Sequence, residues 1–210
     1  MRTLVLSRRQ IQDAVDAGKI TIEEFEPLCL KTCSYSLRLS GKTNVITVPP
    51  GEQPVDVLDL ERTRQLVELR RGEQFVLHPG QFILATSLES LSLDEAIAAF
   101  VTPLSHISRL GVGFLGSTFI RPGFSAGQPT PIVFEFCNHG CLSLLMRRGM
   151  PFCHAVFVEV AREDRELGDT EGRRDVRSNL LFSRYDLKPA YRDIVRKLHS
   201  DRQRDEDNGT

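Results

Sequence analysis

Short apolar runs recur through the middle of the chain and are typical of β-strands. Turn-forming residues separate them, as at Pro79-Gly80, Pro122-Gly123 and Asn138-His139-Gly140. Many short strands with frequent turns predict a β-sandwich or barrel and disfavour a doubly wound parallel sheet. The predicted strands are 35–39, 75–77, 82–85, 114–115, 119–120, 132–136, 142–146 and 152–160, within a β-rich core at about 30–160.

The N-terminal segment has a different period and predicts a helix at 7–17. Ser7 and Gln10 have the spacing of a capping box, and Gly18 stands where a helix C-terminus places glycine. The apolar face of this helix consists of Ile11, Ala14 and Val15. A helical period therefore precedes the strands.

The composition changes after Val160. Residues 161–178 are rich in Arg, Asp and Glu, which predicts a solvated linker. Residues 187–199 predict a short helix, and we expect the last ten residues to be disordered. The sequence thus predicts a β-barrel domain at 1–160 and an extension at 161–210 with a charged linker, a short helix and a disordered tail.

Charge and cysteine content narrow the class of protein. Lys and Arg total 27 against 28 Asp and Glu, so the net charge of −1 argues against a general binder of DNA, RNA or membrane surfaces. No apolar run reaches the length of a membrane span, and the N-terminus lacks the apolar stretch of a signal peptide. Five cysteines, an odd number, are expected to be reduced thiols in a cytoplasmic protein.

Glu135 is the first candidate for chemistry. Its nearest neighbours in the predicted strand, Val133, Phe134, Phe136 and Cys137, are apolar. Burial there would raise the pKa of the carboxyl group, which suits a proton shuttle near neutral pH. Strand alternation gives a second reading, in which Glu135 lies on a solvated face with Val133 and Cys137. The strand pattern leaves both readings open.

Seven segments resemble the dCTP deaminase family over residues 4–160, in the family's order and with nearly its spacing. They are LSRRQIQDAVDAGKI for the first helix, SYSLRLS for ASxDLRLG, HPGQFILATSLESLSLDE for PGEFxLxxTLExxxLPxD, LSHISRLGV for RSSLxRLGL, FIRPGF for FIDPGF, PIVFEFCN for ITLELSN, and MRRGMPFCHAVF for LRPGMxIxQLxF. Their shared order makes coincidence a poor explanation.

This resemblance implies a mainly β fold, a distorted dUTPase-like β-barrel with a short N-terminal helix and a C-terminal helical extension. It also implies a homotrimer with active sites between subunits, and a hydrolase of nucleotide metabolism that converts dCTP to dUTP and ammonia without zinc. By position, Glu135 would take a proton from water, and the hydroxide would attack C4 of cytosine. Ser105 would help to hold the water, and Arg109 would contact the base and support the glutamate.

Several positions depart from the family pattern. Leu104 stands where the family has a phosphate-contacting arginine, and Arg121 replaces the aspartate of FIDPGF. One residue is missing between Gly111 and Pro122, and the family's C-terminal segment that closes over the triphosphate has no match. We expect nucleotide contacts from His106, Thr118, Arg121, Arg148 and His154.

Other readings stay open. One is a catalytically inactive member that binds a nucleotide or a protein through the same inter-subunit cleft. Others are a deaminase for a different cytosine compound and, less favoured, a dUTPase. Zinc is a weak alternative because the motifs of zinc deaminases are absent, although several thiols and imidazoles are close in sequence: Cys137, His139, Cys141, Cys153 and His154. We expect no metal or cofactor for the chemistry, with Mg²⁺ at most carried by the triphosphate.

Overall fold

The computed structural model describes residues 5–46, 67–116 and 118–160. The chain divides into two compact units, and nearly all of the described residues belong to the first, which comprises Met1–Val45 and Leu69–Leu181. All of the predicted site residues belong to this first unit. The predicted linker, helix and tail of 161–210 lie outside the described residues.

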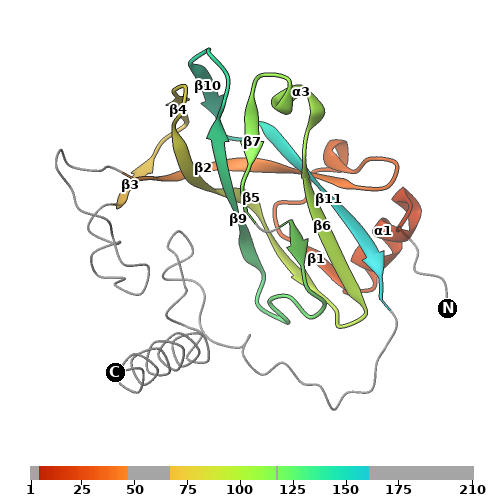
Figure 1. Cartoon of the computed structure of the whole chain (residues 1–210). Coiled ribbons are helices and arrows are strands. Elements are labelled where there is room, and N and C mark those ends of the chain that lie inside the picture. The colour runs from red at the N-terminus through yellow and green to blue at the C-terminus, as the bar shows by residue number, and fades with distance from the viewer. Residues whose placement is uncertain (1–4, 47–66, 117, 161–210) are drawn as a thin grey trace, which may run out of the picture. The chain divides into compact units, whose positions relative to one another are not determined.

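The described residues form one curled nine-stranded sheet and a separate two-stranded sheet (Figure 1). In the large sheet the order is β7-β9-β5-β2-β11-β6-β8, with β1 paired to β5 and β3 to β2, and β10 and β4 form the small sheet. The strands are β1 (Ile20–Ile22), β2 (Tyr35–Ile46), β3 (Val67–Arg71), β4 (Gln74–Leu77), β5 (Phe82–Leu93), β6 (Ile97–Pro103), β7 (Val112–Phe114), β8 (Phe119–Ile120), β9 (Thr130–Asn138), β10 (Leu144–Arg147) and β11 (Pro151–Glu159). The mainly β prediction is confirmed.

The helices are short. α1 (Arg8–Asp16) begins at Ser7, whose Oγ accepts from the Gln10 N–H, while Gln10 Oε1 accepts from the Ser7 N–H at 2.9 Å. The predicted capping box is therefore present, and Gly18 follows the helix with φ +70°. The described residues also contain the 3₁₀ turn η1 (Pro27–Cys29) and the helix α3 (Ser105–Ser108). No helix among the described residues is both long and apolar enough to cross a membrane.

An aromatic cluster fills the inside of the curled sheet. The ring of Phe152 on β11 packs against Phe114, Phe134 and Phe136, with centroids 4.6–5.7 Å apart. Phe134 and Phe136 are almost fully buried. Because successive strand residues point to opposite faces, fixing these two rings in the core turns the intervening residue, Glu135, to the other face of β9.

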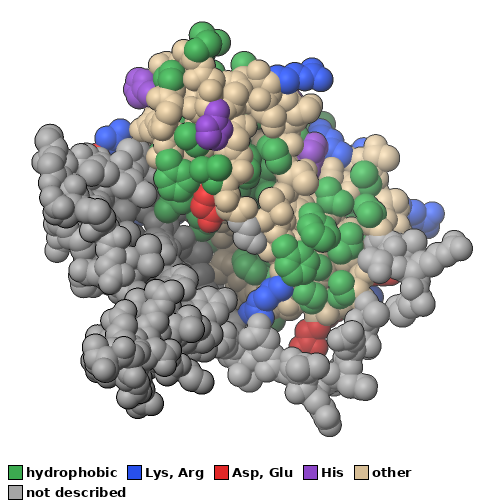
Figure 2. Space-filling view, viewed as in Figure 1, with side chains coloured by type: hydrophobic (Ala, Val, Ile, Leu, Met, Phe, Trp, Pro, Cys, Tyr) green, Lys and Arg blue, Asp and Glu red, His purple; other side chains and the backbone are tan. Residues whose placement is uncertain are grey.

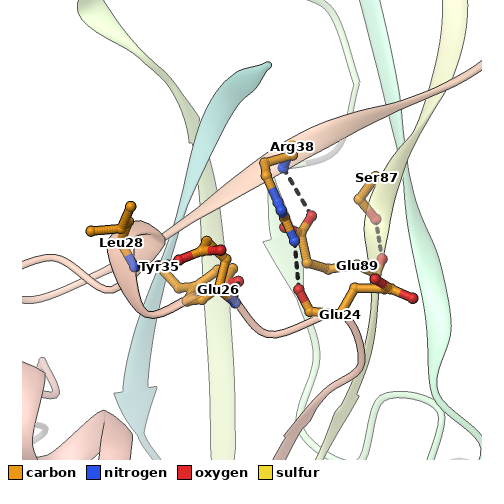
Figure 3. Close-up of polar contacts among 7 residues, drawn as sticks. All are labelled: Glu24, Glu26, Leu28, Tyr35, Arg38, Ser87 and Glu89. Carbon is orange, nitrogen blue, oxygen red and sulfur yellow. Dashed lines mark hydrogen bonds and ion pairs between the residues drawn. The ribbon is translucent and has the colours of Figure 1, made fainter. Parts of the chain in front are cut away.

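A buried ion pair joins β2 to β5 (Figure 3). Glu89 is fully buried, and its carboxylate accepts hydrogen bonds from Arg38 N at 2.8 Å and Arg38 Nε at 2.6 Å. The same guanidinium donates to the carbonyl oxygen of Glu24. Ser87 Oγ donates to the Glu89 carbonyl oxygen and accepts from Ile132 N, which continues the network to β9. This pair is a structural element of the sheet.

Candidate functional site

Glu135 lies half-buried in the middle of β9. Its residue position is opposite Leu84 of β5, and its carbonyl oxygen accepts from the Leu115 N–H at 2.8 Å. Cys137, which simple alternation places on the same face, is buried. The side chain of Glu135 is therefore neither part of the aromatic core nor on a fully solvated strand face.

The Glu135 carboxylate packs directly against the backbone of Gly116. A Cβ atom built on Gly116 would lie 1.6 Å from Glu135 Oε2 and 2.4 Å from its Cδ. Both distances are far below van der Waals contact, so no side chain fits at this position while the carboxylate stays in place. Gly116 follows β7, which pairs with the end of β9. Gly116 was not predicted as a site residue, since a lone glycine in Leu-Gly-Ser carries no recognisable motif.

This environment favours the protonated form of Glu135. Burial raises the pKa of its carboxyl group above the ordinary value, and a hydrogen bond from its own backbone N–H partly opposes that effect. A carboxyl group whose pKa is moved toward neutrality is suited to taking up and returning a proton. This burial supports the reading in which Glu135 is a partly buried carboxyl group with a raised pKa, suited to a proton shuttle.

Ser105, the first residue of α3, and Arg109, the C-cap of this helix, lie at the surface. Both are exposed, and the Arg109 N–H donates to the Ser105 carbonyl oxygen at 3.0 Å. Neither makes a hydrogen bond or ion pair with Glu135 among the described residues of this single chain. Leu104, just before the helix, is 6% exposed and belongs to the core. The position of the family's phosphate-contacting arginine is thus part of the hydrophobic interior here.

His106 and His154 lie on the same side of the unit. His154 on β11 is opposite Ser36 of β2, and its Nδ1 lies 3.3 Å from Ser34 Oγ and 3.4 Å from Ser36 Oγ. Burial lowers the pKa of His154, and the charges of Lys31 and His106 lower it further. The two histidines predicted to contact the nucleotide are therefore electrostatically coupled, and His154 favours its neutral form.

The remaining predicted contacts are spread over the unit. Thr118 is exposed and precedes β8, and Arg121 follows β8 half-buried. Arg148 lies after β10 and pairs with Glu73 across 3.5 Å. One chain does not bring Arg148 into contact with Glu135. Within the described ranges, no group of three or more Cys, His, Asp or Glu side chains is arranged to hold a metal ion.

Hydrophobic side chains also gather on parts of the surface, as the green atoms in Figure 2 show. Two aromatic rings contribute to the exposed apolar surface: Phe100 on β6 and Phe119 on β8 have ring centroids 5.4 Å apart, and both side chains are more than two-fifths exposed. Exposed aromatic surface is enriched where proteins contact one another. The two rings form an exposed aromatic pair at the β8 end of the large sheet.

Comparison with known proteins identifies the family. The sequence model of the dCTP deaminase-like family matches residues 5–160. A protein of Aquifex aeolicus named "dCTP deaminase, dUMP-forming" is 30% identical over 187 residues, which cover 88% of this chain and 99% of that protein. A protein of Corynebacterium efficiens with the same name is 33% identical over 149 residues, or 70% of this chain and 75% of that protein.

A solved structure agrees on the fold. The 2'-deoxycytidine 5'-triphosphate deaminase of Agrobacterium tumefaciens superposes with a TM-score of 0.59 at 19% identity, over 76% of this chain. The match spans 49% of the length of that protein, about half. With the family model extending over most of the sequence, this chain belongs to the dCTP deaminase-like family.

Proposed function

We propose that the protein hydrolytically deaminates a cytosine deoxynucleotide, with dCTP as the first candidate substrate. The observation that carries the proposal is a half-buried glutamate with a raised pKa, Glu135, at the position that matches the family's glutamate. Membership of the dCTP deaminase-like family and relatives named dCTP deaminase support the same substrate class.

In the proposed mechanism Glu135 acts as a single proton shuttle. Its carboxylate takes a proton from water, and the resulting hydroxide attacks C4 of cytosine to give a tetrahedral intermediate. Glu135 then delivers that proton to N3. The same carboxylate next transfers the proton of the new C4 hydroxyl group to the amino group. The bond between C4 and the amino nitrogen then breaks, and ammonia leaves. The reaction uses no metal, and Mg²⁺ enters only with the triphosphate.

We further propose that Ser105 and Arg109 reach Glu135 from a neighbouring subunit of a homotrimer. Their exposure on α3, and the lack of contact with Glu135 within the described part of one chain, support a site completed by a second copy. Closed cyclic symmetry is the usual outcome of one repeated interface. Light scattering should return three times the mass of one chain, and a monomer at micromolar concentration would contradict this assembly.

The product needs its own measurement. Deamination alone gives dUTP, whereas relatives are named dUMP-forming, which requires a further cleavage that releases pyrophosphate. Purified protein should be incubated with dCTP, dCMP, CTP and cytidine, and ammonia, dUTP, dUMP and pyrophosphate should be quantified separately. Ammonia from dCTP supports the proposal. No ammonia from any of the four compounds would favour the inactive, nucleotide- or protein-binding alternative.

Glu135→Gln is expected to abolish ammonia release from dCTP while leaving the fold intact. Losing a general acid–base group typically costs about 10²–10⁴-fold in rate. Because the folded state raises the pKa of Glu135, ionisation of this carboxyl opposes folding as pH rises through that pKa, so the neutral glutamine should raise Tm at pH 7. The matched control is Glu159→Gln, an exposed carboxylate at the end of β11. Full activity of Glu135→Gln would exclude the proposed mechanism.

The rate should fall on the acid side at a higher pH than an ordinary glutamate predicts. Only the ionised carboxylate can take a proton from water, and burial raises the pKa of Glu135. The acid limb of kcat/KM is therefore expected above the ordinary glutamate value of about 4.3. Initial rates of ammonia release across pH 4–9 test this. An acid limb at or below the ordinary value would argue against Glu135 as the proton acceptor.

A further inference from the structure

A cavity of about 490 Å³ lies between β2, β4 and the turn that joins β3 to β4. Its lining includes Arg70, Arg71, Gln74, Phe75 and His78. Glu135 and the residues of α3 are not among its lining residues. None of the three residues proposed for the deamination chemistry, Glu135, Ser105 and Arg109, is among the described residues that line the cavity.

The wall of this cavity is positive. It contains Arg70 and Arg71, and none of its described lining residues is acidic. Arg71 makes no ion pair with any residue that the structure describes, and Arg70 adds a second guanidinium. Glu73, in the same turn, is paired with Arg148 across 3.5 Å. The described lining thus includes basic and no acidic side chains, although the whole chain has a net charge of −1.

Close backbone packing fixes the cavity. Gly41 in β2 has φ +79°, and a Cβ atom there would lie 2.2 Å from the Gly72 carbonyl oxygen. The Gly72 N–H donates to the Gly41 carbonyl oxygen at 3.1 Å. Arg147 donates to Gln74 Oε1 at 2.9 Å, which ties β10 to β4. These contacts hold the turn that follows Arg70 and Arg71, the last residues of β3, against β2, so the site is shaped before any ligand arrives.

We propose that this cavity binds a phosphate-bearing small molecule of about mononucleotide size. A guanidinium can donate two parallel hydrogen bonds to a phosphate. The guanidinium of Arg71 makes no ion pair with a described residue that would occupy these donors. Phe75 and Val76 give the same cavity an apolar side on which a base or sugar can rest. The volume lies in the range of small-molecule sites. The proposed ligand is separate from the substrate held at Glu135.

Calorimetric titration of the full chain with AMP, and with adenosine as the phosphate-free probe, tests the proposal. AMP should bind wild type at least tenfold more tightly than adenosine. Arg71→Gln should weaken AMP binding at least tenfold, whereas Arg9→Gln, an exposed arginine of α1, should leave it unchanged. In labelled protein the amide signals of Gly41 and Gly72 should move on adding AMP, and that of Gly116 should not.

Three outcomes would overturn the proposal: no AMP binding at millimolar concentration, equal binding of AMP and adenosine, or equal binding by wild type and Arg71→Gln. Glu135→Gln should bind AMP as wild type does. Because the titration needs no turnover, failure of the deaminase assay would leave this result intact, and failure of the titration would leave the deaminase proposal intact.

Discussion

Glu89→Ala is expected to destabilise the fold by about 3–5 kcal/mol, the usual cost of removing one partner of a buried ion pair. Glu89 is fully buried, and its carboxylate accepts from both the backbone N–H and the Nε of Arg38. Removing it leaves the Arg38 guanidinium, only 17% exposed, without its counter-charge. A lost backbone hydrogen bond in β2 adds to that cost. Urea unfolding at a fixed protein concentration measures the effect.

Two further variants distinguish the effect of losing the Glu89 charge from the effect of losing its packing. Glu23→Gln changes an exposed carboxylate in the neighbouring loop and should leave the free energy of unfolding within about 0.5 kcal/mol of wild type. Replacing Arg38 and Glu89 together by Met and Leu removes both charges and keeps apolar volume. That double variant should be more stable than Glu89→Ala. If Glu89→Ala unfolds at the wild-type urea concentration, the ion pair does not hold β2 to β5.

The sequence predicted those parts of the fold whose signals are local. The capping box of α1 joins neighbouring residues, and the Pro-Gly turns need glycine at positive φ, as found at Gly80 and Gly123. Three strands, β1, β3 and β6, were not predicted from the sequence. β1 is only three residues long and is held as a strand by its pairing with β5. β6 pairs with β11 along its whole length, and such pairing between distant segments cannot be predicted from a single sequence.

The sequence predicted individual residues of the site but not the contacts that these residues make. Glu135 was visible as a carboxylate in an apolar strand, and the packing of Phe134 and Phe136 explains why it turns away from the core. The family pattern did not predict that Leu104 is buried. Its burial depends on packing beside β11, where the Phe152 carbonyl oxygen accepts a hydrogen bond from the Leu104 N–H. Arg148 was expected to contact the nucleotide, yet within one chain it pairs with Glu73. Such positions depend on contacts between residues far apart in sequence, which sequence spacing does not encode.

Gly116→Ala is expected to reduce kcat/KM for ammonia release by about 10²-fold or more while the fold survives. The added methyl group would lie 1.6 Å from Glu135 Oε2, so the carboxylate or the backbone after β7 must move. A displacement of about 1 Å at a reacting group costs rates of this order. The backbone of Gly116 does not have a positive φ, so its conformation does not require glycine. Glycine is required because there is no room for a Cβ atom beside the Glu135 carboxylate. If Glu135 is the proton shuttle that we propose, Gly116 is a positioning residue for it.

Gly113→Ala, on β7 itself, is the matched control. Its new Cβ atom would meet only the far end of the His139 ring, at 2.8 Å, which a small rotation of that exposed side chain relieves. Its kcat/KM should stay within a few-fold of wild type. If Gly116→Ala pushes the Glu135 carboxylate toward water, the carboxyl pKa should drop toward its ordinary value, and the acid limb of the pH profile should move down with it. Equal losses in the two glycine variants, or an acid limb that does not move, would mean that Gly116 only supports the strand and does not set the position of the carboxylate.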